Sequence, residues 1–239
     1  MLGFYDVDSR DDPLAPGPDF AFRPRVQAVA DGLTRLLLAA EDRGVTIVTR
    51  CLHVCGGRTC RLEIEDGTLT VPMDAGPDDV RRVIRARRGD FARVELERRT
   101  CGRPEENARR RAFDAFHVNP GASAAVEELG VDRWVVLGTS LPVCLLAAVE
   151  GLLALGRDVV VASDAIWDMP RVFTNYAPAD LLRSIAGDGP VGPEHVPAFV
   201  AAYLERYRSL GASTAATREI LGEAAASATT VGATWGGRS

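Results

Sequence analysis

Short apolar runs alternate with segments of helical periodicity along most of this chain. The runs at residues 45–48, 134–137 and 159–162 are apolar and rich in β-branched residues, which is typical of parallel strands buried on both faces. Apolar residues recur at helical spacing over residues 25–43, and Gly44 ends that segment. Because such alternation builds a parallel sheet covered by helices, we predict an α/β fold, a single-domain three-layer αβα architecture. Its mostly parallel, doubly wound sheet would have roughly six strands.

The remaining segments fit the same architecture. Further strands are predicted at residues 2–7 and 91–96, a hairpin at 61–71 that turns at Asp66-Gly67, and helices at 77–88, 122–128, 143–155, 179–186 and 196–209. Apart from the hairpin, we expect residues 51–76 to be irregular and residues 98–111 to form an arginine-rich connection. We expect one domain over residues 1–225 and a flexible tail rich in Gly, Ala and Thr over 226–239.

Charge and composition exclude several kinds of partner. The chain has 239 residues and a net charge of −5, so nucleic-acid phosphates and anionic lipids repel it as a whole. No stretch is long and apolar enough to span a membrane, and the amino-terminal residues are acidic where a signal peptide carries bases. We therefore expect a cytoplasmic protein that binds neither nucleic acid nor membrane. In that compartment the five cysteines remain thiols.

Reactive side chains follow several predicted strands. Asp6 ends the first strand, Cys51 and His53 follow the second, and Cys144 lies beyond the strand that ends at Gly138. Ligands of open α/β sheets bind outside the carboxyl ends of the strands. We therefore expect these side chains to converge on one site.

Cys144 has the sequence position of a nucleophile. It occurs in the run GTSLPVC, where a predicted strand leads into a helix. The unpaired amide N–H groups and the positive dipole end at a helix start favour a thiolate. The alternative is an inert cysteine that packs the helix against the sheet.

Residues 113–165 carry a familiar pattern. AFDAF, GVDRWVVLG, the run that ends at Cys144 and AAVEGLLALGRDVVVASDA occur there in order. Together they resemble the central signature of the isochorismatase-like cysteine hydrolases, a group that includes nicotinamidases, N-carbamoylsarcosine amidases and isochorismatases. The segment Asp6-Val7-Asp8 is similar to the Asp-x-Gln motif of that family, GVTIVTRCLH to its second strand, and LGASTAATREIL to its closing segment.

The resemblance implies catalytic roles for particular residues. Family members use an Asp, a Lys and a Cys, and here Asp6 matches the Asp and Cys144 the nucleophile. Asp6 would take the thiol proton, and Cys144 would attack a carbonyl to give a thioester. The backbone N–H groups of Ser140 and Cys144 would then bind the oxyanion.

The family's lysine is absent, because all 28 Lys and Arg positions are arginine. Alignment on AFDAF places Arg110 at the lysine position, whereas alignment on the end of the third strand places Arg98 or Arg99 there. Arginine supplies positive charge but cannot shuttle protons. Asp8 replaces the family's Gln and adds a second carboxylate near Asp6.

The resemblance also implies ligand-binding residues. Cys51, His53 and Cys60 lie where some relatives hold a divalent metal, and thiolate with imidazole would favour tetrahedral zinc. Alternatively, Cys51 and Cys55 line the substrate pocket or pack under the loop, His53 is a hydrogen-bonding group of the pocket, and no cofactor is required. The predicted substrate-binding residues are Asp8, His53, Phe116, Ser140 and Trp167.

Three functions are compatible with these residues. The first is a hydrolase that cleaves a C–N bond of a small amide, imide or carbamoyl compound through a Cys144 thioester. The second is a repurposed, non-catalytic relative that binds a small molecule or a partner protein, as the missing lysine suggests. The third is a vinyl-ether hydrolase of the isochorismatase type, in which the acid acts and the cysteine is dispensable. Relatives commonly form dimers or tetramers, which implies a homo-oligomer.

Overall fold

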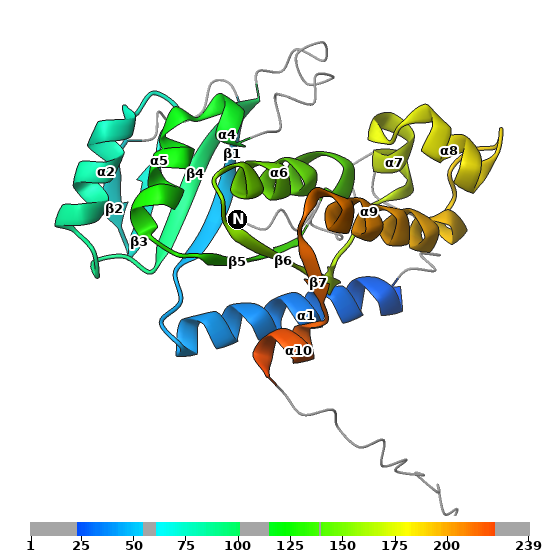
Figure 1. Cartoon of the computed structure of the whole chain (residues 1–239), viewed down its shortest axis with the longest axis horizontal. Coiled ribbons are helices and arrows are strands. Elements are labelled where there is room, and N and C mark those ends of the chain that lie inside the picture. The colour runs from blue at the N-terminus through cyan, green and yellow to red at the C-terminus, as the bar shows by residue number, and fades with distance from the viewer. Residues whose placement is uncertain (1–22, 55–60, 101–114, 139, 223–239) are drawn as a thin grey trace, which may run out of the picture.

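The computed structural model describes residues 23–54, 61–100, 115–138 and 140–222. Over these ranges the chain is an α/β protein with parallel strands and helices on both sides of them (Figure 1). The helices are α1 (Arg23–Asp42), α2 (Pro77–Ala86), α4 (Ala115–Val118), α5 (Pro120–Leu129), η2 (Leu141–Leu145), α6 (Leu146–Ala154), α7 (Pro170–Tyr176), α8 (Ala179–Ala186), η3 (Pro193–His195), α9 (Val196–Leu210) and α10 (Thr217–Leu221). The strands are β1 (Ile47–Val54), β2 (Glu63–Glu65), β3 (Thr68–Val71), β4 (Arg93–Thr100), β5 (Arg133–Gly138), β6 (Asp158–Ile166) and β7 (Ser213–Ala215).

The strands described form two sheets. One has the order β1-β4-β3-β2, and the other has the order β5-β6-β7. All neighbours are parallel except β2 and β3, which form the predicted hairpin. Asp66 and Gly67 both have positive φ at its turn, as a tight two-residue connection requires. The predicted α/β class with a mostly parallel sheet is therefore confirmed.

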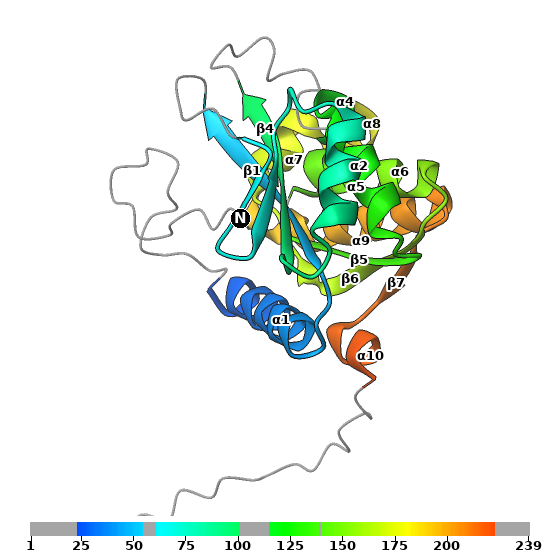
Figure 2. The same cartoon turned by 90° about the vertical axis from the view of Figure 1, so that its left-hand side faces the viewer.

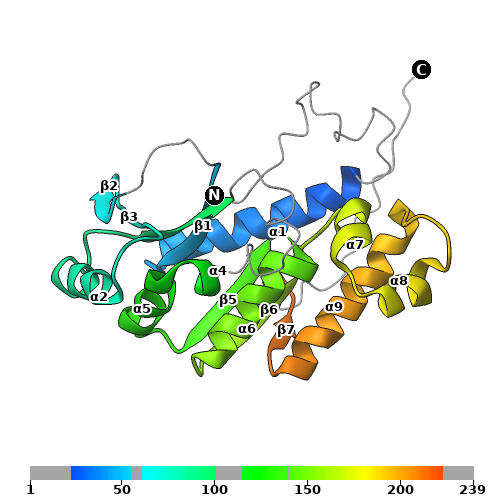
Figure 3. The same ribbon diagram turned by 90° about the horizontal axis from the view of Figure 1, so that it is seen from above.

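Helices cover both faces of the second sheet. The helices α1 and α10 lie along one face, and α6 and α9 lie along the other (Figure 1; α1, α6 and α9 also in Figure 3). Strand β6 shows why, because its successive side chains point to opposite faces. Val159 and Val161 join the core beneath α6 and α9, whereas Ala162 packs with Leu33 and Leu36 of α1. Figure 2 shows the same layers from the side.

A buried asparagine joins the first sheet to its helices. Asn119 caps α5 by accepting a hydrogen bond from the Gly121 amide at 3.0 Å. Its side-chain amide donates to the carbonyls of Val71, at 2.9 Å, and Glu97, at 3.1 Å. One fully buried side chain thereby ties β3, β4 and α5 together.

Several element boundaries differ from the sequence prediction. Strand β1 continues to Val54, so the expectation of irregular structure from residue 51 is wrong for residues 51–54. Strand β4 continues to Thr100, so residues 98–100 are not part of a connection. The polar ends of both strands are strand because β1 and β4 pair in parallel along their whole lengths. The helix α7 and the strand β7 were not predicted from the sequence.

Among the described residues, no helix combines the length and the apolar character that crossing a bilayer requires. The predicted first strand at residues 2–7 and the tail at 226–239 lie outside the described residues. The domain boundaries that depend on those two segments remain predictions.

Candidate active site

The candidate site is the turn that joins β5 to α6. Gly138 ends β5 with φ of +108°, a conformation that favours glycine. The chain then enters η2, a π-helical turn in which the Leu145 amide donates to the Ser140 carbonyl at 2.9 Å. π-Helical turns inside helices occur frequently at functional sites.

Cys144 lies within this π-helical turn, directly before α6. It is a half-buried reduced thiol, flanked by the buried side chains of Val143 and Leu145. The helical segment begins at Leu141, two residues before the predicted start. The sequence therefore correctly placed Cys144 in the first turns of a helix that follows a parallel strand.

A buried carboxylate holds the start of the turn. Asp168 lies just beyond the end of β6, and its side chain is 3% exposed. Its Oδ2 accepts hydrogen bonds from Ser140 Oγ and from the Leu141 amide, both at 2.7 Å. Its Oδ1 accepts from the Met169 amide at 3.1 Å. Three donors therefore converge on one side chain.

Burial governs the ionisation of this carboxylate. It raises the pKa of Asp168 to about 7, and the hydrogen bonds from Ser140, Leu141 and Met169 offset only part of this effect. Tyr207 of α9 binds the same turn, because its hydroxyl donates to the Leu141 carbonyl at 2.7 Å. Burial likewise raises the pKa of Tyr207, so its hydroxyl remains a donor.

The structure places two predicted substrate-binding residues beside this turn and a third on the helix that follows it. Ser140 caps η2 and is half-buried. Trp167 directly precedes Asp168, and its amide donates to the Gly138 carbonyl at 3.3 Å. Phe116 packs against α6, where its ring lies over Gly151. Ser140 and Trp167 thus adjoin the Cys144 turn, whereas the Phe116 ring contacts the middle of α6.

Other predicted site residues cannot be placed relative to Cys144. Asp6, Asp8, Cys60 and Arg110 lie outside the described residues. Cys51 and His53 are on β1, and Arg98 and Arg99 are on β4, but the described side chains do not include them. In the parallel register His53 is opposite Arg99. Their roles remain predictions.

No group of three or more His, Cys, Asp or Glu side chains that could hold a metal occurs among the residues that the structure describes. The predicted zinc ligands Cys51, His53 and Cys60 are outside this search, because their side chains are not described. The donor set of two thiolates and an imidazole is chemically suited to zinc. The zinc site remains a prediction.

Sequence reasoning missed Asp168. The acid lies beyond the apolar run that predicts β6, in the segment Ala165-Ile166-Trp167-Asp168. The available signal was an acid at the carboxyl end of a parallel strand, the same rule that selected Asp6. Only the fold shows that it is buried against the turn of a neighbouring strand.

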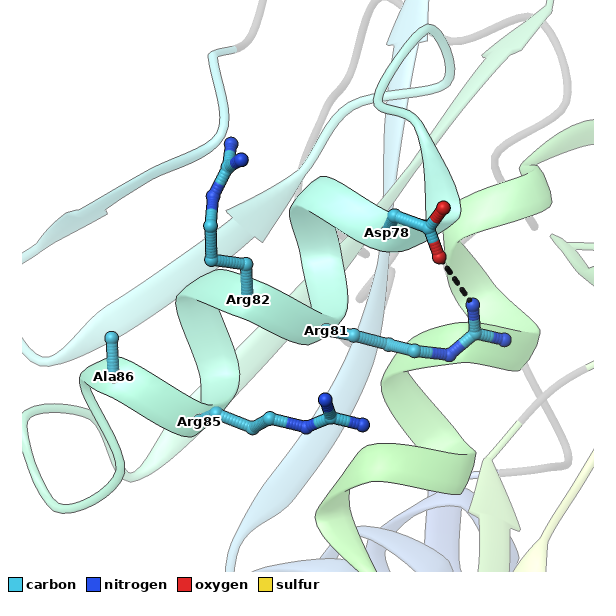
Figure 4. Close-up of a pocket in the computed structure, with 5 residues that line it drawn as sticks. All are labelled: Asp78, Arg81, Arg82, Arg85 and Ala86. Atoms are coloured by element: carbon cyan, nitrogen blue, oxygen red, sulfur yellow. Dashed lines mark hydrogen bonds and ion pairs between the residues drawn. The ribbon is translucent and has the colours of Figure 1, made fainter.

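A surface hollow on α2 is not a second reactive site. Its volume is about 550 Å³, and its lining consists of Asp78, Arg81, Arg82, Arg85 and Ala86 (Figure 4). Carboxylates neutralise its arginines: Arg81 contacts Asp78 at 3.0 Å and Glu127 at 2.9 Å, Arg85 contacts Glu128 at 2.8 Å, and Arg82 pairs with Asp79. The Arg81 and Arg85 guanidinium groups therefore tie α2 to α5, and the charge of Arg82 is paired within α2.

The described geometry defines a class of protein: an αβα fold that carries a cysteine on a helical turn after a parallel strand. The family model of the isochorismatase domain matches residues 21–182. This match covers more than half of the chain, which therefore belongs to the isochorismatase family, within a superfamily of hydrolases.

Three solved structures are similar to this chain at low sequence identity. A cysteine hydrolase from Pseudomonas syringae pv. phaseolicola 1448A has a TM-score of 0.50 and 16% identity, and the match covers 82% of this chain and 80% of that one. The nicotinamidase SaPncA from Staphylococcus aureus gives a TM-score of 0.41 with 13% identity, over 79% of this chain and 82% of that one. The nicotinamidase PncA from Bacillus subtilis gives 0.43 with 13% identity, over 80% and 86%. No curated protein sequence matches the chain.

Proposed function

We propose that this protein hydrolyses a C–N bond in a small amide, imide or carbamoyl compound through a thioester on Cys144. The observation that carries the proposal is the position of Cys144, half-buried in a π-helical turn after a parallel strand of an isochorismatase-family fold. Amide N–H groups at the start of a helix favour both a thiolate and the oxyanion of an attacked carbonyl.

The proposed reaction has two steps. In the first, the Cys144 thiolate attacks the carbonyl carbon, and the C–N bond breaks as the nitrogen leaves with a proton. In the second, water attacks the thioester, and the C–S bond breaks to release the acid or carbamate and restore the thiol. We propose that Asp6 takes the thiol proton and returns it to the leaving nitrogen. No cofactor takes part in this sequence.

An arginine would replace the family lysine in this mechanism. We propose Arg110 for this role, with Arg98 and Arg99 as the alternatives. A guanidinium stabilises the neighbouring anions but keeps its proton. Proton transfer would therefore depend on Asp6 alone.

The amide-hydrolase proposal predicts loss of turnover in Cys144→Ala. The assay offers purified protein a panel of primary amides, cyclic imides and N-carbamoyl compounds, and mass spectrometry follows the products. We expect at least about a 10³-fold loss of rate in Cys144→Ala, and Cys101→Ala, at another of the five cysteines, serves as the matched control because Cys101 has no role in the proposed reaction. Hydroxylamine trapping of an acyl group on the Cys144 peptide tests the thioester directly. Full activity in Cys144→Ala would rule out this mechanism.

A second candidate function is ligand binding without catalysis. The observation that favours it is the absence of lysine from a chain with 28 basic positions, because the family's reaction uses that amine. This candidate predicts saturable binding of panel compounds without turnover. Loss of activity in Asp6→Asn but not in Cys144→Ala would instead indicate vinyl-ether hydrolysis.

A further inference from the structure

Two side chains from distant parts of the chain hold the first residues of the Cys144 turn. Asp168, after β6, binds the Ser140 hydroxyl and the Leu141 amide at 2.7 Å each. Tyr207, from α9, donates to the Leu141 carbonyl at 2.7 Å. Both polar groups of the Leu141 peptide are therefore fixed from outside the helix that the residue begins.

The turn is buried where these bonds form. Leu141 and Tyr207 are fully buried, and Asp168 is 3% exposed. Hydrogen bonds in such a low-dielectric environment are stronger than in water, and leaving one of their partners unsatisfied is costly. The position of Cys144, three residues after Leu141, is therefore coupled to these contacts.

We propose that Asp168 is a positioning residue for Cys144: it fixes the Ser140–Leu141 peptide and thereby orients the thiol and the amide donors of the turn. The inference rests on the proposed function, because it concerns the nucleophile named there. Asp168 acts through the turn and takes no part in bond making.

The hydrogen-bonding pattern uses both side-chain oxygens of Asp168 as acceptors. Both oxygens of Asp168 face backbone N–H donors, namely Leu141 at Oδ2 and Met169 at Oδ1. An asparagine presents one oxygen and one NH₂ group. In either orientation of the amide, its NH₂ group faces a backbone N–H, so one of the two tethers is lost.

We call the hydrogen bonds of Asp168 and Tyr207 to Ser140 and Leu141 the clamp. The ionisable groups near the clamp set its response to pH. Asp168 faces the Ser140 hydroxyl on the turn, and the turn also contacts Tyr207 on α9. Tyr203 and Arg206 on α9 and Glu150 on α6 interact electrostatically with Tyr207. Because burial raises the pKa of Asp168 to about 7, the clamp changes charge near neutral pH.

The test compares Asp168→Asn with the matched control Asp164→Asn. Asp164, on β6, accepts from the Thr217 amide and hydroxyl at 2.7 Å each, but it binds the first residue of α10 rather than the Cys144 turn. Iodoacetamide alkylation of Cys144 is followed by site-resolved mass spectrometry from mildly acidic to alkaline pH. Hydrogen exchange of the peptide that spans the turn is measured in parallel.

We expect Asp168→Asn to slow the alkylation of Cys144 by about fivefold, the size of a helix-terminus interaction, and to remove an inflection near pH 7 from the wild-type profile. An Asp168 with no influence on Cys144 would not produce that inflection, and exchange at the turn reports the tether itself. Exchange at the turn should rise in Asp168→Asn, whereas Asp164→Asn should leave both the profile and the exchange at the turn unchanged.

Each other outcome is decisive. If wild-type Cys144 reacts and Asp168→Asn has the same rate and profile, the positioning role is wrong and the proposed function is untouched. If wild-type Cys144 is inert towards iodoacetamide, the proposed function fails. If hydrogen exchange at the turn is also unchanged in Asp168→Asn, then Asp168 does not hold the turn and the positioning role is wrong as well. If Asp168→Asn does not fold, Ser140→Ala removes one bond of the same clamp, and unaltered alkylation and exchange there overturn the inference.

Discussion

At the residue scale, Asp168 is an ionisable side chain in a buried position, and burial disfavours its charged form. Its carboxylate is buried, and three donors compensate only part of the lost hydration. Such an arrangement costs stability when the group is ionised, and perturbed carboxylates of this kind cluster at functional sites. The stability of the protein should therefore report the ionisation of Asp168.

The first prediction concerns the pH dependence of stability. The pKa of Asp168 is about 7 in the fold and about 4 in an unfolded chain, so between these values the folded state binds the extra proton. The free energy of unfolding should therefore fall as pH rises through this window, by at most about 4 kcal/mol in total. Asp168→Asn should lack this decline. Urea unfolding at several pH values measures it, and parallel curves for the two proteins would contradict it.

The second prediction concerns Tyr207→Phe. This change removes the hydroxyl that donates to the Leu141 carbonyl and keeps the ring in the aromatic cluster with Tyr203. We expect a loss of about 1 kcal/mol in the free energy of unfolding. Because burial raises the pKa of Tyr207, the loss should be equal at neutral and mildly alkaline pH, unlike the effect of Asp168→Asn. A pH-dependent loss would contradict this reasoning.

The residues of the site differ in how well sequence could predict them. Cys144 was predictable because its signal is local: a strand, a short turn and a helix in succession. The Asp168 and Tyr207 contacts were not, because they join the turn to segments far along the chain. Whether a polar residue is buried depends on tertiary packing, which a local pattern does not encode.

At the element scale, periodicity located the elements better than it located their ends. The helix at residues 179–186 was predicted to the residue, whereas β1 and β4 run beyond their apolar cores. Polar residues such as those of Arg98–Arg99 carry no strand signal, and their pairing with β1 makes them strand. The short β7 exists because it pairs with β6.

The third prediction tests the packing of α4 on α6. A Cβ added at Gly151 would lie 2.2 Å from the Phe116 ring, so Gly151→Ala must displace the ring or the helix. We expect a loss of about 1–3 kcal/mol, even though alanine favours helix. Gly189→Ala is the control, because its nearest neighbour, the Ala186 carbonyl, would be 3.6 Å away. Chemical denaturation of both variants measures the difference, and equal stabilities would refute the close contact.

The fourth prediction tests the ion pairs between α2 and α5. The double change Glu127→Gln with Glu128→Gln breaks the contacts to Arg81 and Arg85. We expect a lower thermal midpoint at low salt and a smaller difference at high salt, because exposed pairs are screened. Glu205→Gln is the control, since it breaks a pair within α9 alone. A difference that persists at high salt would show that the pairs act by packing instead.

At the scale of the whole molecule, alternation predicted the class of fold and the mostly parallel pairing. The number of strands in one continuous sheet was not confirmed, because the described residues form two sheets. Among the described strands, β1 is an edge strand of the first sheet and β5 is an edge strand of the second. Parallel strands are normally covered and paired, and the predicted strand at residues 2–7 would pair with both. The same strand would bring Asp6 to the carboxyl end of β5.

The fifth prediction concerns that amino-terminal segment. Among the described residues β5 is an edge strand of its sheet, so a strand paired beside it would satisfy its backbone and stabilise the sheet. The predicted strand at residues 2–7 would be central to the sheet, so deletion of residues 1–8 should lower the free energy of unfolding by several kcal/mol. Deletion of the predicted tail, residues 226–239, is the control and should leave stability unchanged. Equal stability of the two truncated proteins would mean that the sheet is complete without the segment, and Asp6 would lose its proposed place beside Cys144.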